Sequence, residues 1–245
     1  METIQRAQEW RRTLHSMPET GMKEVATSAF IARALAEMGI SCHTGIGGTG
    51  VVGSLIRGSS TKSIGLRADM DGLPIDEQTG VAHASTNGVM HACGHDGHMA
   101  MVLGAAHYLS TQGKFDGKVH FLFQPAEEHG LGAKAMLADG LLQKIPMDSM
   151  YGIHNLPGLA VGTFATRPGA LMASEDNFVI EIRGRGGHAA RPQAVVDPIV
   201  IGAEIVTALQ SIVGRNVDPA KSAVISCTEF ITDGARNAIP TNVTI

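Results

Sequence analysis

The sequence has few charged side chains, few aromatic rings, no excess of basic residues and no long apolar run. Charged residues make up 17% of the 245 residues, the formal net charge is −4 at pH 7, and aromatic residues make up 4%, with a single Trp. Such a chain has no basic excess to neutralise phosphates and few rings on which bases could stack, which argues against nucleic acid as a partner. No run of about 18 apolar residues is present, so the sequence predicts no membrane span.

Cysteine is also scarce. The chain has three cysteines, Cys42, Cys93 and Cys227, which are odd in number and far apart. This argues against a disulfide framework and favours a reducing cytoplasm. Residues 1–17 lack the apolar stretch of a secretory signal, which also favours a cytoplasmic protein. Each cysteine is then either a small core residue, or a metal ligand or nucleophile.

Apolar residues make up 44% of the chain, which is enough to bury a sizeable core. Their spacing predicts helices that alternate with β-rich runs, an order typical of an α/β protein with a largely parallel sheet. Helices are expected at residues 4–15, 25–38, 98–112, 132–142 and 198–212, and strands at 50–56, 63–68, 118–123, 150–154, 177–183 and 222–230. The polar turn between the first two strands predicts a hairpin, and segment 156–174 is the candidate domain boundary.

The eleven histidines are unevenly placed, and segment 90–98 holds three of them with Cys93 and Asp96. Thiolate and imidazole are ligands for zinc-like divalent ions. Cys93 and His95 are two apart on an extended segment, so their side chains point the same way and can bind one ion or a pair. The alternative interpretation is that Asp96 caps a helix and that the histidines are incidental.

Glu127 and Glu128 follow the predicted strand 118–123. Adjacent carboxylates repel each other, and their placement at a strand end is costly unless cations are present. In metal-dependent hydrolysis one carboxylate can bind the ion while the other takes a proton from water and passes it to the leaving group. An isolated pair of this kind is equally well explained as a solvated acidic turn.

Two further predicted strands end in side chains of the same kind. Asp69 and Asp71 follow strand 63–68, and His154 ends strand 150–154. Taken alone, a histidine such as His154 is more often a satisfied polar residue than a ligand. Three strands that end in Asp, Glu or His, with a Cys-x-His loop between two of them, together predict a metal site at the carboxyl edge of a parallel sheet.

At these residues the chain resembles the M20 family of metallopeptidases. More narrowly, it is similar to the amidohydrolase branch that contains hippurate hydrolases, N-acyl-amino-acid amidohydrolases and auxin-conjugate hydrolases. The matching segments occur in the family's order: LHSMPETGMKE at 14–24, GLRADMDGLPI at 65–75, MHACGHDGHMA at 90–100, FLFQPAEE at 121–128, GIHNLPG at 152–158, GRGGHAARP at 184–192 and GARNAIP at 234–240.

The resemblance implies a zinc-peptidase-like catalytic α/β domain, whose N-terminal part would be residues 1–173, and the start of a smaller inserted α/β dimerisation or lid domain at residues 174–245. It also implies two divalent metal ions, with Mn, Zn, Co and Ni all compatible with the ligand types. The implied roles are metal ligation by Cys93, His95, Glu128 and His154, general base for Glu127, contact with the substrate carbonyl for His188, substrate contact for Asn237, and orientation of a metal-binding residue for Asp71.

The activity implied by the resemblance is hydrolysis of the amide bond of N-acyl amino acids, hippurate among them, by a homodimer that forms through the inserted domain. Arg191 and Arg236 are nearby candidates for binding the substrate carboxylate. The family pattern continues beyond Ile245 and includes a last metal-ligating histidine. The alternative is therefore a truncated, catalytically inactive metal-binding or dimer-interacting remnant, and the DNA beyond codon 245 would distinguish the two. A thiol-dependent oxidoreductase that uses Cys93 lacks a Cys-x-x-Cys partner.

Overall fold

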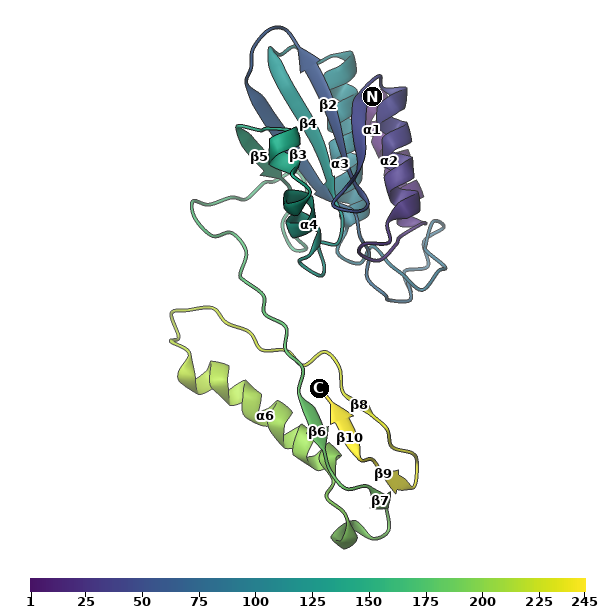
Figure 1. Ribbon diagram of the computed structural model, residues 1–245, viewed down its shortest axis with the longest axis vertical. Helices are drawn as coiled ribbons and strands as arrows, with labels where there is room; N and C mark the ends of the chain where they lie inside the picture. Colours follow the sequence, from purple (N-terminus) through teal and green to yellow (C-terminus); the bar gives the residue numbers. More distant parts are fainter. The chain divides into compact units, whose positions relative to one another are not determined.

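The chain folds into two compact units, Met1–Thr163 and Phe164–Ile245, in a computed structural model that describes all 245 residues (Figure 1). The division between them lies inside the Pro- and Gly-containing segment 156–174, before the domain boundary predicted at residue 173, which stays a prediction.

A five-stranded mixed sheet forms the centre of the first unit, and its strand order is β1-β2-β4-β3-β5. β3 is parallel to both β4 and β5, whereas β2 is antiparallel to β1 and β4. This architecture confirms the predicted α/β class with a mixed sheet. The strands are β1 Ser41–Ile46, β2 Gly50–Arg57, β3 Ser63–Asp69, β4 Gly117–Gln124 and β5 Ser149–Gly152.

The predicted hairpin between residues 50–56 and 63–68 is wrong. β4 lies between β2 and β3 and pairs with both of them. Residues of β4 are almost all buried, and a strand with two apolar faces is better placed in the centre of a sheet than at its edge. The hairpin partner of β2 is β1, which sequence patterning missed because most of its side chains are exposed and polar.

Helices cover both faces of this sheet. Alternate residues of β4 point to opposite faces: Val119, Phe121 and Phe123 belong to the larger apolar cluster, which includes residues of α1, α2 and α3, and Leu122 belongs to a second cluster with residues of α4 and α5. The helices are α1 Glu2–His15, α2 Val25–Glu37, α3 His95–Thr111, α4 Gly132–Ala138 and α5 Leu141–Lys144. The single helix predicted at 132–142 is interrupted at Gly140, whose φ of 78° is left-handed.

The second unit combines one long helix with short antiparallel strands. β10 (Asn242–Thr244) lies between β6 (Glu181–Arg183) and β8 (Ile231–Thr232), and β7 (Gly187–His188) pairs with β9 (Ala238–Ile239). α6 spans Pro198–Asn216. Its N-cap residue is Asp197, whose carboxylate accepts the Ile199 backbone N–H. The strand predicted at 222–230 does not form, because those residues have no ladder partner.

α6 leaves much of its apolar surface exposed, including Ile199, Val200 and Ile212. By length and composition it is apolar enough to cross a membrane, and 11% of its most apolar window is buried. Core helices of soluble proteins and signal sequences have the same length and apolar composition, so this helix alone does not indicate a membrane span. The absence of a membrane partner and the homodimer through this unit both stay predictions.

Leu35 on α2 offers a direct test of the larger apolar cluster. Its side chain is 0% exposed and fills the space that Gly53 of β2 leaves open. We expect Leu35→Ala to lower the free energy of unfolding of the first unit by about 3 kcal/mol, because lost transfer energy and a residual cavity add. Leu137→Ala on α4, at a side chain 51% exposed, is the matched control and should cost less than about 1 kcal/mol. Equal losses in chemical denaturation would contradict this packing.

Candidate metal centre

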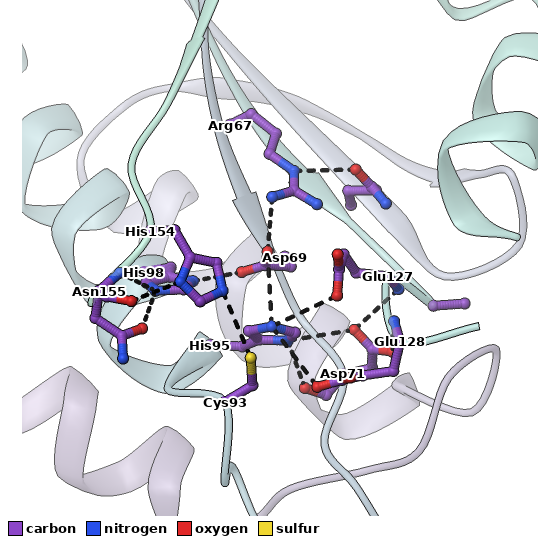
Figure 2. Close-up of polar contacts among 12 residues, drawn as sticks. Arg67, Asp69, Asp71, Cys93, His95, His98, Glu127, Glu128, His154 and Asn155 are labelled. Atoms are coloured by element: carbon purple, nitrogen blue, oxygen red, sulfur yellow. Dashed lines mark hydrogen bonds and ion pairs between the residues drawn. The ribbon is translucent and has the colours of Figure 1, made fainter. Parts of the chain in front are cut away.

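The carboxyl ends of β3, β4 and β5 meet at one edge of the sheet, since β3 is parallel to both neighbours. β3 ends at Asp69, a short turn carries Glu127 and Glu128 beyond β4, and His154 lies two residues beyond β5. α3 begins at this edge with His95. The structure thus brings six of the predicted site residues together, as Figure 2 shows: Asp71, Cys93, His95, Glu127, Glu128 and His154.

The His95 imidazole lies at the centre of this group and is fully buried. Its Nε2 atom is 3.7 Å from an oxygen of Asp69, 3.8 Å from Glu127 Oε2 and 3.9 Å from Glu128 Oε1. Its other nitrogen, Nδ1, is 2.8 Å from the backbone carbonyl oxygen of Asp71. A carbonyl oxygen can only accept, so the chemistry assigns the proton to Nδ1 and leaves a lone pair on Nε2.

His154 has the same arrangement. Its Nδ1 donates to the Asn155 carbonyl oxygen at 2.7 Å, and its Nε2 lies 3.5 Å from the Cys93 sulfur. Metal-ligating histidines donate the second ring nitrogen to a carbonyl or carboxylate, which fixes the tautomer and the ring orientation. The two imidazoles therefore both present a lone pair to the space around the Cys93 thiol and the two glutamates.

Three overlapping groups of side chains have ligand atoms close enough to hold an ion, and His95 belongs to all three: Cys93, His95 and His154; His95, Glu127 and Glu128; and Asp69, His95 and His98. The third group fits worst, because both nitrogens of His98 are already used. Its Nδ1 lies 2.6 Å from Asp69 Oδ1, and its Nε2 accepts the Asn155 backbone N–H at 3.1 Å. The first two groups are the better ligand sets.

Unsatisfied polar atoms support a metal at this place. His95 Nε2 and Glu128 Oε1 are both buried without a hydrogen-bond partner. A buried polar atom without a partner is costly, and most native structures avoid it. Both atoms are ordinary ligands of divalent ions, and both lie in the group that His95 shares with Glu127 and Glu128. The residues present therefore fit a bound divalent metal.

The electrostatics of the group agree with this fit. Burial, followed by the carboxylates of Glu128 and Glu127, raises the pKa of the Cys93 thiol to about 11. Burial also raises the pKa of Glu128, although His95 opposes the change. Burial alone would lower the pKa of His95, but the hydrogen bond to Asp71 and the nearby carboxylates raise it. Nearby carboxylates contribute to each of these shifts, and a divalent cation would neutralise their negative charge.

Asp71 holds the acidic turn rather than facing the ligand space. Its two carboxylate oxygens each accept a backbone N–H at 3.1 Å, one from Glu127 and one from Glu128. Although burial opposes it, the hydrogen bonds from His95 and from these two amides lower the pKa of Asp71. The side chain therefore holds the backbone of two predicted site residues and contacts one imidazole, and its predicted supporting role stays a prediction.

Sequence reasoning gave no individual role to Asp69, His98 and Asn155, which form a hydrogen-bonded network beside His154, with Asp69 and His98 buried. Asp69 also pairs with Arg67 at 2.6 Å, and although burial opposes it, the hydrogen bond from His98 holds the pKa of Asp69 well below its usual range. The place of Asp69 at a strand end already included it in the predicted site, but its pairing with His98 and Arg67 depends on contacts that the sequence pattern does not show.

The alternative interpretation of Asp96 as a helix cap is wrong. The N-cap of α3 is Gly94, whose φ is 88°, and no side chain caps the helix. The Asp96 carboxylate instead accepts from His15 Nδ1 and from Arg11 Nε, each at 2.8 Å. These contacts tie the first turn of α3, and with it His95, to the C-terminal end of α1.

The remaining predicted site residues, His188 and Asn237, lie next to each other in the second unit. His188 pairs with Ala238 across β7 and β9, and the Ala189 N–H donates to the Asn237 carbonyl oxygen at 3.0 Å. The His188 Nδ1 accepts the Ala190 N–H at 3.1 Å, so the ring proton is on Nε2. The His188 Nε2–H group is therefore left as a hydrogen-bond donor, beside the Asn237 backbone.

Comparison with known proteins agrees with the metal-binding arrangement. The profile of peptidase family M20/M25/M40 matches residues 65–244. The hippurate hydrolase of Campylobacter jejuni is 48% identical over 236 residues, which are 96% of this chain and 61% of that protein. The N-acetyl-L-cysteine deacetylase of Bacillus subtilis is 45% identical over 237 residues, which are 96% of this chain and 56% of that protein. The chain thus spans 56–61% of the length of these two relatives.

Among solved structures, the chain is similar to the YXEP protein of Bacillus subtilis, described as a dinuclear metal binding peptidase from the M20 family. The TM-score is 0.69 at 34% sequence identity, and the match covers 99% of this chain and 63% of that one. The predicted catalytic-domain fold is therefore that of a known metallopeptidase.

The raised pKa of Cys93 predicts slow alkylation of the metal-free chain. With a pKa of about 11, about one Cys93 thiol in a thousand is ionised at pH 8, and only the thiolate is nucleophilic. Cys227 is exposed and serves as a control on the same molecule. We expect iodoacetamide to label Cys227 at least ten times faster than Cys93, as measured by peptide mass spectrometry. Equal labelling rates for the two cysteines would contradict the raised pKa of Cys93.

Proposed function

The chain belongs to peptidase family M20/M25/M40, and on that premise we propose that it hydrolyses the amide bond of N-acyl amino acids, including hippurate-like substrates, with the help of divalent metal ions. The products would be a carboxylic acid and a free amino acid. The observation that carries the proposal is the set of unpaired ligand atoms around His95 Nε2, next to a second carboxylate that can move a proton.

Four side chains would hold the metal ions: Cys93, His95, Glu128 and His154. When bound, such ions polarise a carbonyl group and lower the pKa of water. The ligand types suit Zn, Mn, Co and Ni to different degrees, so the proposal does not depend on one metal. Two ions rather than one are proposed, because the similar YXEP protein is described as a dinuclear metal binding peptidase and because the candidate ligands form two groups. The single lone pair of His95 Nε2 would serve one of the two ions.

The two glutamates differ in a way that suggests separate roles. The side chain of Glu128 is 18% exposed and has a buried oxygen without a partner, whereas the side chain of Glu127 is 39% exposed. A carboxylate with an orphaned buried oxygen is suited to ligation. A carboxylate that reaches solvent is suited to accept a proton from water and to deliver it to the departing amine. We therefore assign the general base to Glu127.

His188 and Asn237 complete the proposal from the second unit. The Nε2–H group of a neutral imidazole donates a hydrogen bond, and such a donor stabilises the charge that develops on an amide oxygen during attack. The Nδ1 contact with the Ala190 N–H supports this tautomer of His188. Asn237 immediately precedes β9, its carbonyl oxygen accepts the Ala189 N–H, and it is assigned to substrate contact.

The substrate class rests on the names of the relatives. One is a hippurate hydrolase and another an N-acetyl-L-cysteine deacetylase, and each name describes removal of an acyl group from the nitrogen of an amino acid. The acyl groups named differ in size and polarity, so the proposal extends to N-acyl amino acids as a class.

A second candidate function is metal binding without turnover. It concerns residues 1–245 taken alone, which span 61% and 56% of the relatives' length. The two candidates share every metal ligand of the first unit, and they differ only in whether amide hydrolysis follows.

Matched substitutions of the two glutamates test the assignment. Glu127→Gln should lower kcat for hippurate by about 10²- to 10⁴-fold, the usual contribution of a general base, and should keep the metal content. Glu128→Gln should lower the metal affinity by about tenfold or more, because it replaces a ligand oxygen that carries charge. Metal content by elemental analysis and hydrolysis by release of glycine provide the two measurements.

The unmodified chain, reconstituted with Mn²⁺ or Zn²⁺, is the reference for both variants. Metal binding without release of amino acid from any N-acyl substrate would favour the second candidate. Loss of metal from Glu127→Gln but not from Glu128→Gln would reverse the two roles.

A further inference from the structure

The chain has only two non-glycine residues with positive φ, Met22 at 63° and Ala126 at 43°. The left-handed region is unfavourable for side chains with a Cβ, and such residues concentrate where the surroundings enforce them. Met22 and Ala126 lie in neighbouring segments, because Gly21, the residue before Met22, packs on Ala126. Gly21 packs so tightly on Ala126 that a Cβ at position 21 would be 3.0 Å from its Cα. Ala126 immediately precedes the glutamate pair.

The segment between α1 and α2 is attached to both loops that carry the acidic residues. Thr20 forms a parallel bridge with Gly72, and the Gly72 N–H donates to the Glu19 carbonyl oxygen at 2.8 Å. At its other end, the Glu24 carboxylate accepts the Ala126 N–H at 2.7 Å. One short segment thus fixes the loop after β3 and the turn after β4.

Glu24 is fully buried and does not serve the helix on which it stands. It is the N-cap residue of α2, but its side chain makes no cap hydrogen bond. Glu19 instead accepts the N–H groups of Ala26 and Thr27 at 3.2 and 2.8 Å. The Glu24 carboxylate is therefore left free for two other donors, the Thr49 hydroxyl at 2.6 Å and the Ala126 N–H.

Three consecutive backbone N–H groups of the acidic turn are consequently held by buried carboxylates. Ala126 donates to Glu24, while Glu127 and Glu128 donate to Asp71. The first of these contacts fixes the residue whose left-handed φ sets the direction in which the chain leaves β4. A change of φ at position 126 would rotate the following peptide and redirect the Glu127 side chain.

We propose that Glu24 is a positioning residue for Glu127: by binding the Ala126 N–H it holds the left-handed backbone from which the general base projects. The inference rests on the proposed function for the role of Glu127, but the backbone restraint can be measured without turnover. Glu24 acts through the Ala126 backbone, whereas the metal ligands are held by other contacts.

Glu24→Leu removes both hydrogen bonds at nearly constant volume, and Glu24→Gln keeps them, because its amide oxygen can accept from Ala126 and its amide nitrogen can donate to the Thr49 hydroxyl. Glu19→Leu is the matched control on the same segment, since it removes the α2 cap without touching the acidic turn. Glu24→Asp keeps the charge but shortens the side chain, and it replaces Glu24→Leu if that variant does not fold.

We expect Glu24→Leu to raise the hydrogen-exchange rate of the Ala126–Glu128 amides at least tenfold. We also expect it to lower kcat by about 10²-fold with KM within about threefold and the metal content unchanged, since a small misplacement of a reacting group has an effect of this size. Glu24→Gln should stay within about threefold of the parent in each measurement.

Glu19→Leu should lower the unfolding temperature and leave exchange at residues 126–128 unchanged. Ala126→Gly, introduced into Glu24→Leu, should recover part of kcat because glycine adopts positive φ without strain.

The inference is overturned if Glu24→Leu or Glu24→Asp leaves exchange and kcat unchanged, if Glu24→Gln is as damaging as Glu24→Leu, or if Glu19→Leu has the same effects as Glu24→Leu. If the unmodified chain hydrolyses no N-acyl amino acid, the proposed function fails, and the exchange rates alone then decide the role of Glu24.

Discussion

The concentration of negative charge around the His95 imidazole is the constraint on which the rest of this site depends. Four carboxylates and a thiol lie within a few ångströms of one buried ring, and Asp69 among them also pairs with Arg67 and His98. Like charges at this spacing destabilise the fold unless protons or cations neutralise them. Burial first, and neighbouring carboxylates after it, raise the pKa of Cys93 and of Glu128, and bound divalent ions would neutralise the negative charge of both groups.

Some carboxylates of the site accept hydrogen bonds with both oxygens, whereas Glu128 has an oxygen without a partner. Asp71 and Glu24 are buried, and each accepts backbone N–H groups of the acidic turn, so their negative charge is used in holding the chain. The Glu128 carboxylate has a buried oxygen with no partner, and His95 has a buried nitrogen with none. The supporting carboxylates thus have hydrogen-bond partners, while His95 Nε2 and Glu128 Oε1 have none. This is the pattern expected around a bound ion. The mixed sheet makes this possible because three parallel strands end at the same edge.

The sequence was sufficient to predict this edge, since apolar strands that end in Asp, Glu or His are visible without knowledge of the pairing. It was not sufficient for the strand order. The hairpin between β2 and β3 was expected from a local turn, whereas the observed partner of both is β4, which is far away in the chain. β1 was missed for a related reason, because an exposed edge strand lacks the apolar pattern. The role of Glu24 depends on a contact across 102 residues, and no periodicity records such a contact.

The most direct test of the central claim is X-ray absorption spectroscopy of the zinc-loaded chain. The account predicts a sulfur shell at about 2.3 Å from zinc, together with nitrogen or oxygen ligands at about 2.0–2.2 Å. The sulfur shell should disappear in Cys93→Ser and remain in Cys227→Ser, because only the first of these thiols lies beside the two imidazoles. A first shell of nitrogen and oxygen alone in the unmodified chain, or a sulfur shell that survives Cys93→Ser, would contradict it.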